Sequence, residues 1–221
     1  MPIGFQSITD DGILQIDSER KCYVFKASGV VTSTLGGGVY VATVTRPLGT
    51  SPLFFIHEGD GAFLSADISG SNKNYYIYTP AASNVRWYEF DVISGSGVGN
   101  VGFQLFNSAS QLTFDAAQRP LTPYAVATGV KPSAGVTTSI NTGRTYAVHI
   151  PTAPLRYIFV TNVPKVGDTG RYYIIRPIRS GSNILFEQYD YIGEDAPGAS
   201  TNTEMNPVSC IVIDVHNFIA S

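Results

Sequence analysis

The chain has 221 residues, of which 43% are hydrophobic and 14% charged, and its formal net charge is −3. This hydrophobic content excludes a disordered chain, because it buries enough apolar area to offset the entropy lost on ordering. The 14 Lys and Arg residues form no basic run and are outnumbered by 17 Asp and Glu residues, so binding to nucleic acid is not expected. No apolar stretch has the length of a membrane span, and the start, Met1 to Gln6, lacks the features of a signal peptide; neither membrane insertion nor Sec-type export is expected.

All predicted elements are β-strands, because no window carries helical apolar periodicity without interruption by Gly, Pro or paired β-branched residues. Turn clusters such as Gly59-Asp60-Gly61 and Gly70-Ser71-Asn72 separate short apolar runs. Many short strands at this spacing are typical of sandwiches and barrels, so we expect an all-β fold. In chain order, strands are predicted over Ile13 to Asp17, Cys22 to Thr32, Val39 to Thr45, Leu53 to His57, Ala62 to Ala66, Tyr75 to Thr79, Val85 to Ile93, Val101 to Asn107, Gln111 to Asp115, Tyr124 to Thr128, Tyr146 to Ile150, Leu155 to Val160, Arg171 to Arg176, Ile184 to Ile192 and Ser209 to Phe218.

Five matches recur in the same order in the two halves, at a nearly constant offset of about 100 residues. They pair Gly4-Phe5-Gln6 to Asp17 with Gly102-Phe103-Gln104 to Asp115, Ala27-Ser28-Gly29-Val30 with Ala127-Thr128-Gly129-Val130, Thr50-Ser51-Pro52-Leu53 with Thr152-Ala153-Pro154-Leu155, Tyr75-Tyr76-Ile77 with Tyr172-Tyr173-Ile174, and Asn84 to Ile93 with Asn183 to Ile192.

We therefore predict two tandem β-sandwich modules of one topology, arising by internal duplication. The N-terminal module covers residues 1–100 and the C-terminal module residues 101–221, with an extra closing strand. In this prediction, Cys210 to Val215 takes the place that Val101 to Asn107 takes after the first module.

The repeated residues have structural explanations. A role in folding is enough to explain each of them, and no catalytic role is needed. The assignments are a bulge or close backbone approach for Gly29 and Gly129, a strand entry that needs no donor for Pro52 and Pro154, and a large core residue for Trp87 and Phe186.

The obvious candidates for metal or base chemistry are His57, His149 and His216. None has a second ligand-type residue at i+2 or i+4. The nearest approach to a metal site is His57-Glu58-Gly59-Asp60, and a polar loop is the alternative. The chain has no Gly-x-Ser-x-Gly elbow, and Cys22 and Cys210 lie within apolar runs where free thiols behave as small hydrophobes, a disulfide being the alternative. We predict no catalytic residue, cofactor or metal.

Aromatic residues cluster on the predicted strands and supply the possible ligand or subunit contacts. Rings on a β surface can stack on sugars, which permits a carbohydrate-binding hypothesis. Period-2 alternation, however, sends adjacent rings of Tyr75-Tyr76-Ile77-Tyr78 to opposite faces, so about half of them are expected in the core. The candidate contact residues are Tyr75, Tyr78, Tyr88, Tyr172 and Tyr191.

One segment carries a resemblance to a known group of proteins. Gly102-Phe103-Gln104-Leu105-Phe106-Asn107, a polar turn, then Leu112-Thr113-Phe114-Asp115 and Arg119-Pro120-Leu121, resembles a pattern of small virion proteins of long-tailed bacteriophages. Those proteins open with a Gly-Leu-Gln-like strand and a Phe-Asp segment, and they belong to the tail tip or tail fibre. The first copy departs from the pattern at Ile16-Asp17-Ser18 and lacks the Arg-Pro pair.

This resemblance implies a structural or adhesive tail subunit, located in the virion, with a role in assembly and host attachment. Its implied partners are further copies of itself, most simply a trimer, other tail proteins, and a bacterial surface glycan or pilus. A carbohydrate-binding module is the alternative. A third hypothesis is a glycan-cleaving enzyme using Glu187 and Asp190, which is disfavoured because both lie on one short strand.

Overall fold

A computed structural model describes residues 6–8, 14–17, 19–36, 38–95, 102–131, 134–151, 156–159, 170–191, 203–204 and 207–218. The fold is all-β, and its one helical element within these residues is a single 3-10 turn, η1 (Ala116–Gln118). The strands are Gln6–Ile8 (β1), Leu14–Asp17 (β2), Tyr23–Thr32 (β3), Thr34–Gly36 (β4), Val39–Pro47 (β5), Leu53–His57 (β6), Ala62–Ser69 (β7), Asn72–Thr79 (β8), Asn84–Val92 (β9), Gln104–Phe106 (β10), Leu112–Asp115 (β11), Pro123–Val130 (β12), Val136–Ser139 (β13), Tyr146–His149 (β14), Arg156–Phe159 (β15), Gly170–Ser180 (β16), Asn183–Tyr191 (β17), Thr203–Glu204 (β18) and Val208–Asp214 (β19).

Each strand predicted from the sequence overlaps an observed strand, although some predicted ranges are longer, and the all-β prediction is confirmed. Four short strands were not predicted, namely β1, β4, β13 and β18. Each has four residues or fewer, and none of them is a run of apolar residues.

The chain forms two compact units. The first comprises residues 1–27, 49–53 and 89–122. Its described core is a small cluster of Val24, Ile93 and Leu112, with the half-buried Cys22 packed against it. The buried Asp91 carboxylate accepts hydrogen bonds from the backbone N–H groups of Thr50 and Ser51, both at 2.8 Å.

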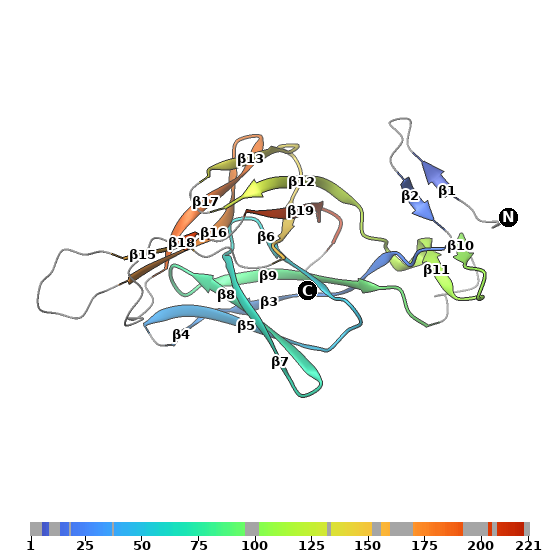
Figure 1. Cartoon of the computed structure of the whole chain (residues 1–221), viewed down its shortest axis with the longest axis horizontal. Coiled ribbons are helices and arrows are strands. Elements are labelled where there is room, and N and C mark those ends of the chain that lie inside the picture. Colours follow the sequence, from blue (N-terminus) through green and yellow to red (C-terminus); the bar gives the residue numbers. More distant parts are fainter. Residues whose placement is uncertain are drawn as a thin grey trace, which may run out of the picture. The chain divides into compact units, whose positions relative to one another are not determined.

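The second unit comprises residues 28–48, 54–88 and 123–221 and contains three larger sheets. Two of them have the strand orders β4-β5-β8-β7 and β13-β17-β16-β15-β18 (Figure 1). The third sheet has the order β12-β19-β14-β6-β9-β3, and its strands β3, β6 and β9 also supply residues to the first unit. At the centre of this sheet, β14 pairs antiparallel with β6, with Ala147 opposite His57 and Val148 opposite Ile56.

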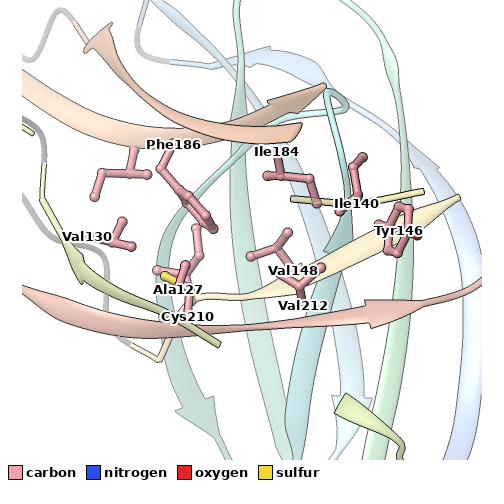
Figure 2. Close-up of a cluster of buried hydrophobic side chains, with 11 residues drawn as sticks. Ala127, Val130, Ile140, Tyr146, Val148, Ile184, Phe186, Cys210 and Val212 are labelled. Atoms are coloured by element: carbon pink, nitrogen blue, oxygen red, sulfur yellow. The ribbon is translucent and has the colours of Figure 1, made fainter. Parts of the chain in front are cut away.

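A buried cluster joins the β12-β19-β14 part of the large sheet to the β13-β17-β16 part of the five-stranded sheet, as in a sandwich. Figure 2 shows Phe186 and Ile184 pointing from one layer towards side chains of the other. The cluster consists of Ala127, Val130, Ile140, Tyr146, Val148, Ile150, Ile175, Ile184, Phe186, Cys210 and Val212.

A second packed region lies around Trp87. Phe54 of β6 stacks on Tyr75 of β8 at a centroid separation of 4.0 Å and on Trp87 of β9 at 5.8 Å. A Cβ atom at Gly29 would lie 3.0 Å from the Trp87 ring, so this glycine allows a close backbone approach, as predicted. Gly129 has φ +73° and lies where the register of β12 with β19 shifts, which agrees with a bulge, one of the two alternatives predicted for it.

The sequence matches agree with the strand pairing only in part. The hairpin match is reproduced in detail: Gln6 pairs with Asp17 and Gln104 with Asp115, and both hairpins shift register after the second pair. The matched segments 27–30 and 127–130 lie on β3 and β12, which occupy the two edges of the large sheet.

Later matches fall on strands with different neighbours. The match of Asn84 to Ile93 with Asn183 to Ile192 relates β9 to β17. In their sheets β9 lies between β6 and β3, whereas β17 lies between β13 and β16. The closing-strand correspondence is wrong, because β10 pairs with β11 whereas β19 pairs with β12 and β14. Pro52 directly precedes β6, as predicted, and Pro154 lies outside the described residues.

Candidate functional site

The loop Glu58 to Gly61 follows His57, the last residue of β6, and contains the acidic residues that the sequence offered for metal binding. His57 and Glu58 are both more than nine-tenths buried. The His57 Nδ1 atom lies 2.9 Å from the Glu58 carbonyl oxygen and 3.4 Å from the Asp60 carboxylate. Gly59 adopts φ +82°, a conformation that favours glycine, and its N–H donates to the Pro177 carbonyl of β16.

Asp60 is held by Arg86 of β9. The guanidinium donates from Nε to Asp60 Oδ2 at 2.8 Å and from Nη2 to Oδ1 at 2.7 Å, and the Arg86 backbone N–H also donates to Oδ2. Burial by itself would raise the pKa of Asp60, but the hydrogen bonds from Arg86 and His57 outweigh it and lower the pKa to about 2. The same bond raises the pKa of Arg86. Asp60 therefore carries a compensated negative charge.

Glu58 is held by Arg179 of β16. The guanidinium donates to Glu58 Oε1 from Nη2 at 2.5 Å and from Nε at 3.2 Å. Arg179 also donates to the backbone carbonyls of Thr142 and Arg144, and its guanidinium lies over the Tyr146 ring at 5.8 Å. The Glu58 and Tyr146 backbones are joined by a hydrogen bond of 3.1 Å. This loop thus ties β6 to β14 and β16.

The geometry favours the polar-loop alternative over a metal site. Both carboxylates of the loop are engaged by arginines, and within the described part of the chain no group of three His, Cys, Asp or Glu residues could hold a metal ion. His149 Nδ1 lies 2.8 Å from the Phe54 carbonyl, and burial lowers the pKa of His149. Both cysteines are free thiols, and burial raises the pKa of Cys210 to about 12.

The candidate tyrosines have different environments. Tyr75 and Tyr88 are only 2% and 3% exposed, so their side chains are buried and do not lie on the surface. Tyr78 is half-buried. Tyr172 and Tyr191 pair with each other across β16 and β17, and their side chains lie outside the described part.

The alternation expected along β8 is confirmed. Tyr75 and Ile77 face the core, whereas Tyr76 and Tyr78 lie on the opposite side and are partly exposed. On that outer face the Tyr76 hydroxyl donates to Asp67 Oδ2 at 2.9 Å, and this bond raises the pKa of Tyr76. The aromatic cluster in the sequence includes Tyr76, but its contact with Asp67 was not predicted. The signal was the Ser69-Gly70-Ser71-Asn72 turn, because a hairpin centred there places Asp67 beside Asn74.

Of the carboxylate pair in the hydrolase hypothesis, only the Glu187 side chain lies in the described part. Arg176 donates to Glu187 Oε1 from Nη2 at 2.5 Å and from Nε at 3.0 Å, so Glu187 forms a cross-strand ion pair. The Asp190 side chain lies outside the described part.

Comparison with known proteins found no matching family model, curated protein or solved structure. Among the residues that the structure describes, none form a helix long and apolar enough to cross a membrane.

Proposed function

We propose that the chain is a structural or adhesive subunit of a bacteriophage tail tip or tail fibre, without catalytic activity of its own. The observation that carries the proposal is the hairpin β10–β11, which holds the residues of the resemblance. Gln104 and Asp115 are paired across it, and the Gln104 amide donates to the Asp115 carboxylate at 3.3 Å. The buried Asp115 also accepts from the Ala117 N–H and so caps η1. The Gln and Asp of the pattern thus stabilise one local structure.

The same proposal includes two β-sandwich modules over residues 1–100 and 101–221, related by duplication. Its support is the strand neighbours: β9 lies between β3 and β6, as β19 lies between β12 and β14. Likewise β8 lies between β5 and β7, as β17 lies between β13 and β16. In this equivalence β19 is the counterpart of β9, and β15 and β18 are the additions of the second module.

Two local sequences support this equivalence. The β7–β8 and β16–β17 hairpins both turn through Ser-Gly-Ser-Asn, at Ser69–Asn72 and Ser180–Asn183. Gly70 and Gly181 have φ of +61° and +60°. β6 and β14 both end in the order aromatic, any residue, aliphatic, histidine.

Self-association into a homo-oligomer, with a trimer as the simplest state, belongs to the same proposal. The support is a set of large apolar side chains that are at least 40% exposed. Burial of such side chains between subunits, or against other tail proteins, is the usual way to remove them from water. They are Val30, Leu35, Leu48, Ile68, Phe103, Phe106, Tyr124 and Val126.

The test is the location of the chain. Virions from the source of the gene are purified on a density gradient, analysed by mass spectrometry, and labelled with gold-conjugated antibody against the chain. We expect peptides of the chain in the virion fraction and gold at the distal end of the tail. Absence of the chain from intact particles, or gold on the capsid alone, would contradict the proposal.

A carbohydrate-binding module is the second candidate function. The specific observation in its favour is the exposed face of β8, where tyrosine rings lie beside a hydrogen-bonded carboxylate and amide. Adhesion to a bacterial glycan would unite both candidates.

A further inference from the structure

A row of polar side chains crosses the outer face of the β4-β5-β8-β7 sheet. Asp67 of β7 pairs with Asn74 of β8, and Asn74 pairs with Thr45 of β5. The Asn74 amide donates to Asp67 Oδ1 at 2.8 Å, and the Thr45 hydroxyl donates to Asn74 Oδ1 at 2.9 Å. These bonds fix the orientations of the Asn74 amide and the Asp67 carboxylate, although both bonds are exposed to solvent.

Two aromatic rings continue this face along β8. Tyr76 lies two residues beyond Asn74 and donates its hydroxyl proton to Asp67 Oδ2 at 2.9 Å, so its ring is anchored at one end. Tyr78 follows two residues further on the same side and is half-buried. The face therefore combines two tyrosine rings, of which Tyr76 is anchored through its hydroxyl, with a row of side chains that hydrogen-bond one another.

The corresponding sheet of the second half is built differently at the same pairing positions. There Ile178 of β16 pairs with Leu185 of β17, and Leu185 pairs with Thr137 of β13. The polar row Asp67–Asn74–Thr45 thus has the counterpart Ile178–Leu185–Thr137. A sheet with this strand order forms without the polar row, so the row is not needed to hold such a sheet together.

The charges on this face select the class of ligand. Asp67 is the only charged residue in the row, and the neighbouring Lys73 points to the other side, where its ammonium lies 5.2 Å from the Tyr75 centroid. Donor-rich hydroxyl groups suit a carboxylate and an amide, whereas an anionic ligand would meet Asp67 without a compensating cation in the row.

We propose that this face, made by Thr45, Asp67, Asn74, Tyr76 and Tyr78, binds an uncharged glycan. The Tyr76 and Tyr78 rings stack on the C–H faces of the sugar, and the polar row hydrogen-bonds its hydroxyls. The inference rests on the proposed adhesive function and assigns that function to one sheet of the first module.

The experiment measures binding of the purified full chain to an array of uncharged and anionic bacterial polysaccharides, followed by calorimetry on the strongest ligand. We expect an uncharged glycan to bind. Tyr76→Ala removes a stacking ring and should weaken binding about tenfold. Asp67→Ala, which changes an exposed side chain, should also weaken it and serves where Tyr76→Ala folds poorly.

Matched controls come from the second half of the chain. Thr45→Ala removes a hydroxyl from the polar row and should weaken binding, whereas Thr137→Ala, at the corresponding exposed position, should leave the affinity unchanged. Three results would overturn the proposal: binding of anionic glycans alone, binding of no glycan, or an affinity indifferent to Tyr76→Ala and Asp67→Ala in folded variants. The gold-labelling experiment is independent, so a chain found on tails that binds no uncharged glycan would refute only this inference.

Discussion

Two ion pairs of the chain differ strongly in burial, so we expect the loss of one arginine to change the free energy of unfolding by different amounts. Arg179 pairs with Glu58, whose side chain is 5% exposed, whereas Arg144 pairs with Asp214, and these side chains are 47% and 27% exposed. Removing one partner leaves a buried carboxylate without compensation in the first case and a hydrated one in the second.

We predict that Arg179→Met lowers the free energy of unfolding by about 3 kcal/mol, and that Arg144→Met lowers it by less than about 1 kcal/mol. Urea denaturation at neutral pH measures both. Equal effects of the two substitutions would show that the Glu58 pair does not stabilise the junction of β6, β14 and β16.

Asp60 makes stability depend on pH. Its pKa is about 2 in the folded chain, below the ordinary value near 4, so the unfolded chain binds the proton first as the pH falls. The stabilisation is therefore complete above about pH 4 and is lost as the pH falls towards 2; the shift corresponds to about 2 kcal/mol. Urea denaturation between pH 5 and pH 2 should show a steeper loss of stability for the wild type than for Asp60→Asn. If the free energies of unfolding of the wild type and of Asp60→Asn fall in parallel with pH, other groups cause the acid sensitivity.

At the level of single residues, the sequence predicted environments better than contacts. Alternation correctly separated Tyr75 from Tyr76. The repeated glycines were predicted to mark a bulge or a close backbone approach, and only the structure shows that Gly29 makes the close approach and that Gly129 lies at a register shift. The partners Arg86, Arg179 and Asp67 were not predicted, because they come from strands whose pairing depends on the tertiary fold.

At the level of elements, strand existence was predictable and strand equivalence was not. Apolar runs bounded by Gly, Asp and Asn located the long strands, and four short strands lacked any such pattern. The matches Tyr-Tyr-Ile and Asn84 with Asn183 suggested a constant offset, but they fall on strands that have different neighbours in their sheets. The Ser-Gly-Ser-Asn turns were the better signal, because they occupy the same place in two hairpins.

The two turns provide an element-scale prediction. Gly70 and Gly181 share a left-handed conformation, and no atom lies within 4 Å of a Cβ built on either. Gly70→Ala and Gly181→Ala should each cost about 1 kcal/mol through backbone strain alone. Gly135→Ala is the control, because Gly135 has an ordinary backbone and one contact at 3.9 Å. Thermal denaturation compares the three variants; a large difference between the first two would contradict the equivalence of the hairpins.

For the whole molecule, few charges and exposed apolar side chains lead to a prediction about association. The interface should draw on aromatic and β-branched side chains and bury at least about 2,000 Å² in total. Association should then persist in molar salt, since screening weakens ion pairs and not apolar burial. Sedimentation equilibrium at micromolar concentration is the measurement, with a trimer mass expected in low and high salt. A monomer in both would refute self-association.

The proposed duplication accounts for the strand order of the central sheet. In its order β12-β19-β14-β6-β9-β3, three strands of the second proposed module are followed by three of the first. The proposed counterparts β14 and β6 meet in the middle, and β12 and β3 lie at the two edges. The antiparallel pair β14·β6 at the junction is then the contact that two related modules would make about a local two-fold axis.

The most direct test of two related modules is an experimentally determined structure of the full chain, with residues 1–100 superposed on residues 101–221. We predict that β3, β5, β6, β7, β8 and β9 superpose on β12, β13, β14, β16, β17 and β19 in that connection order, with the Ser-Gly-Ser-Asn turns coinciding. A superposition in which these strands align only with a different connection order, or not at all, would contradict it.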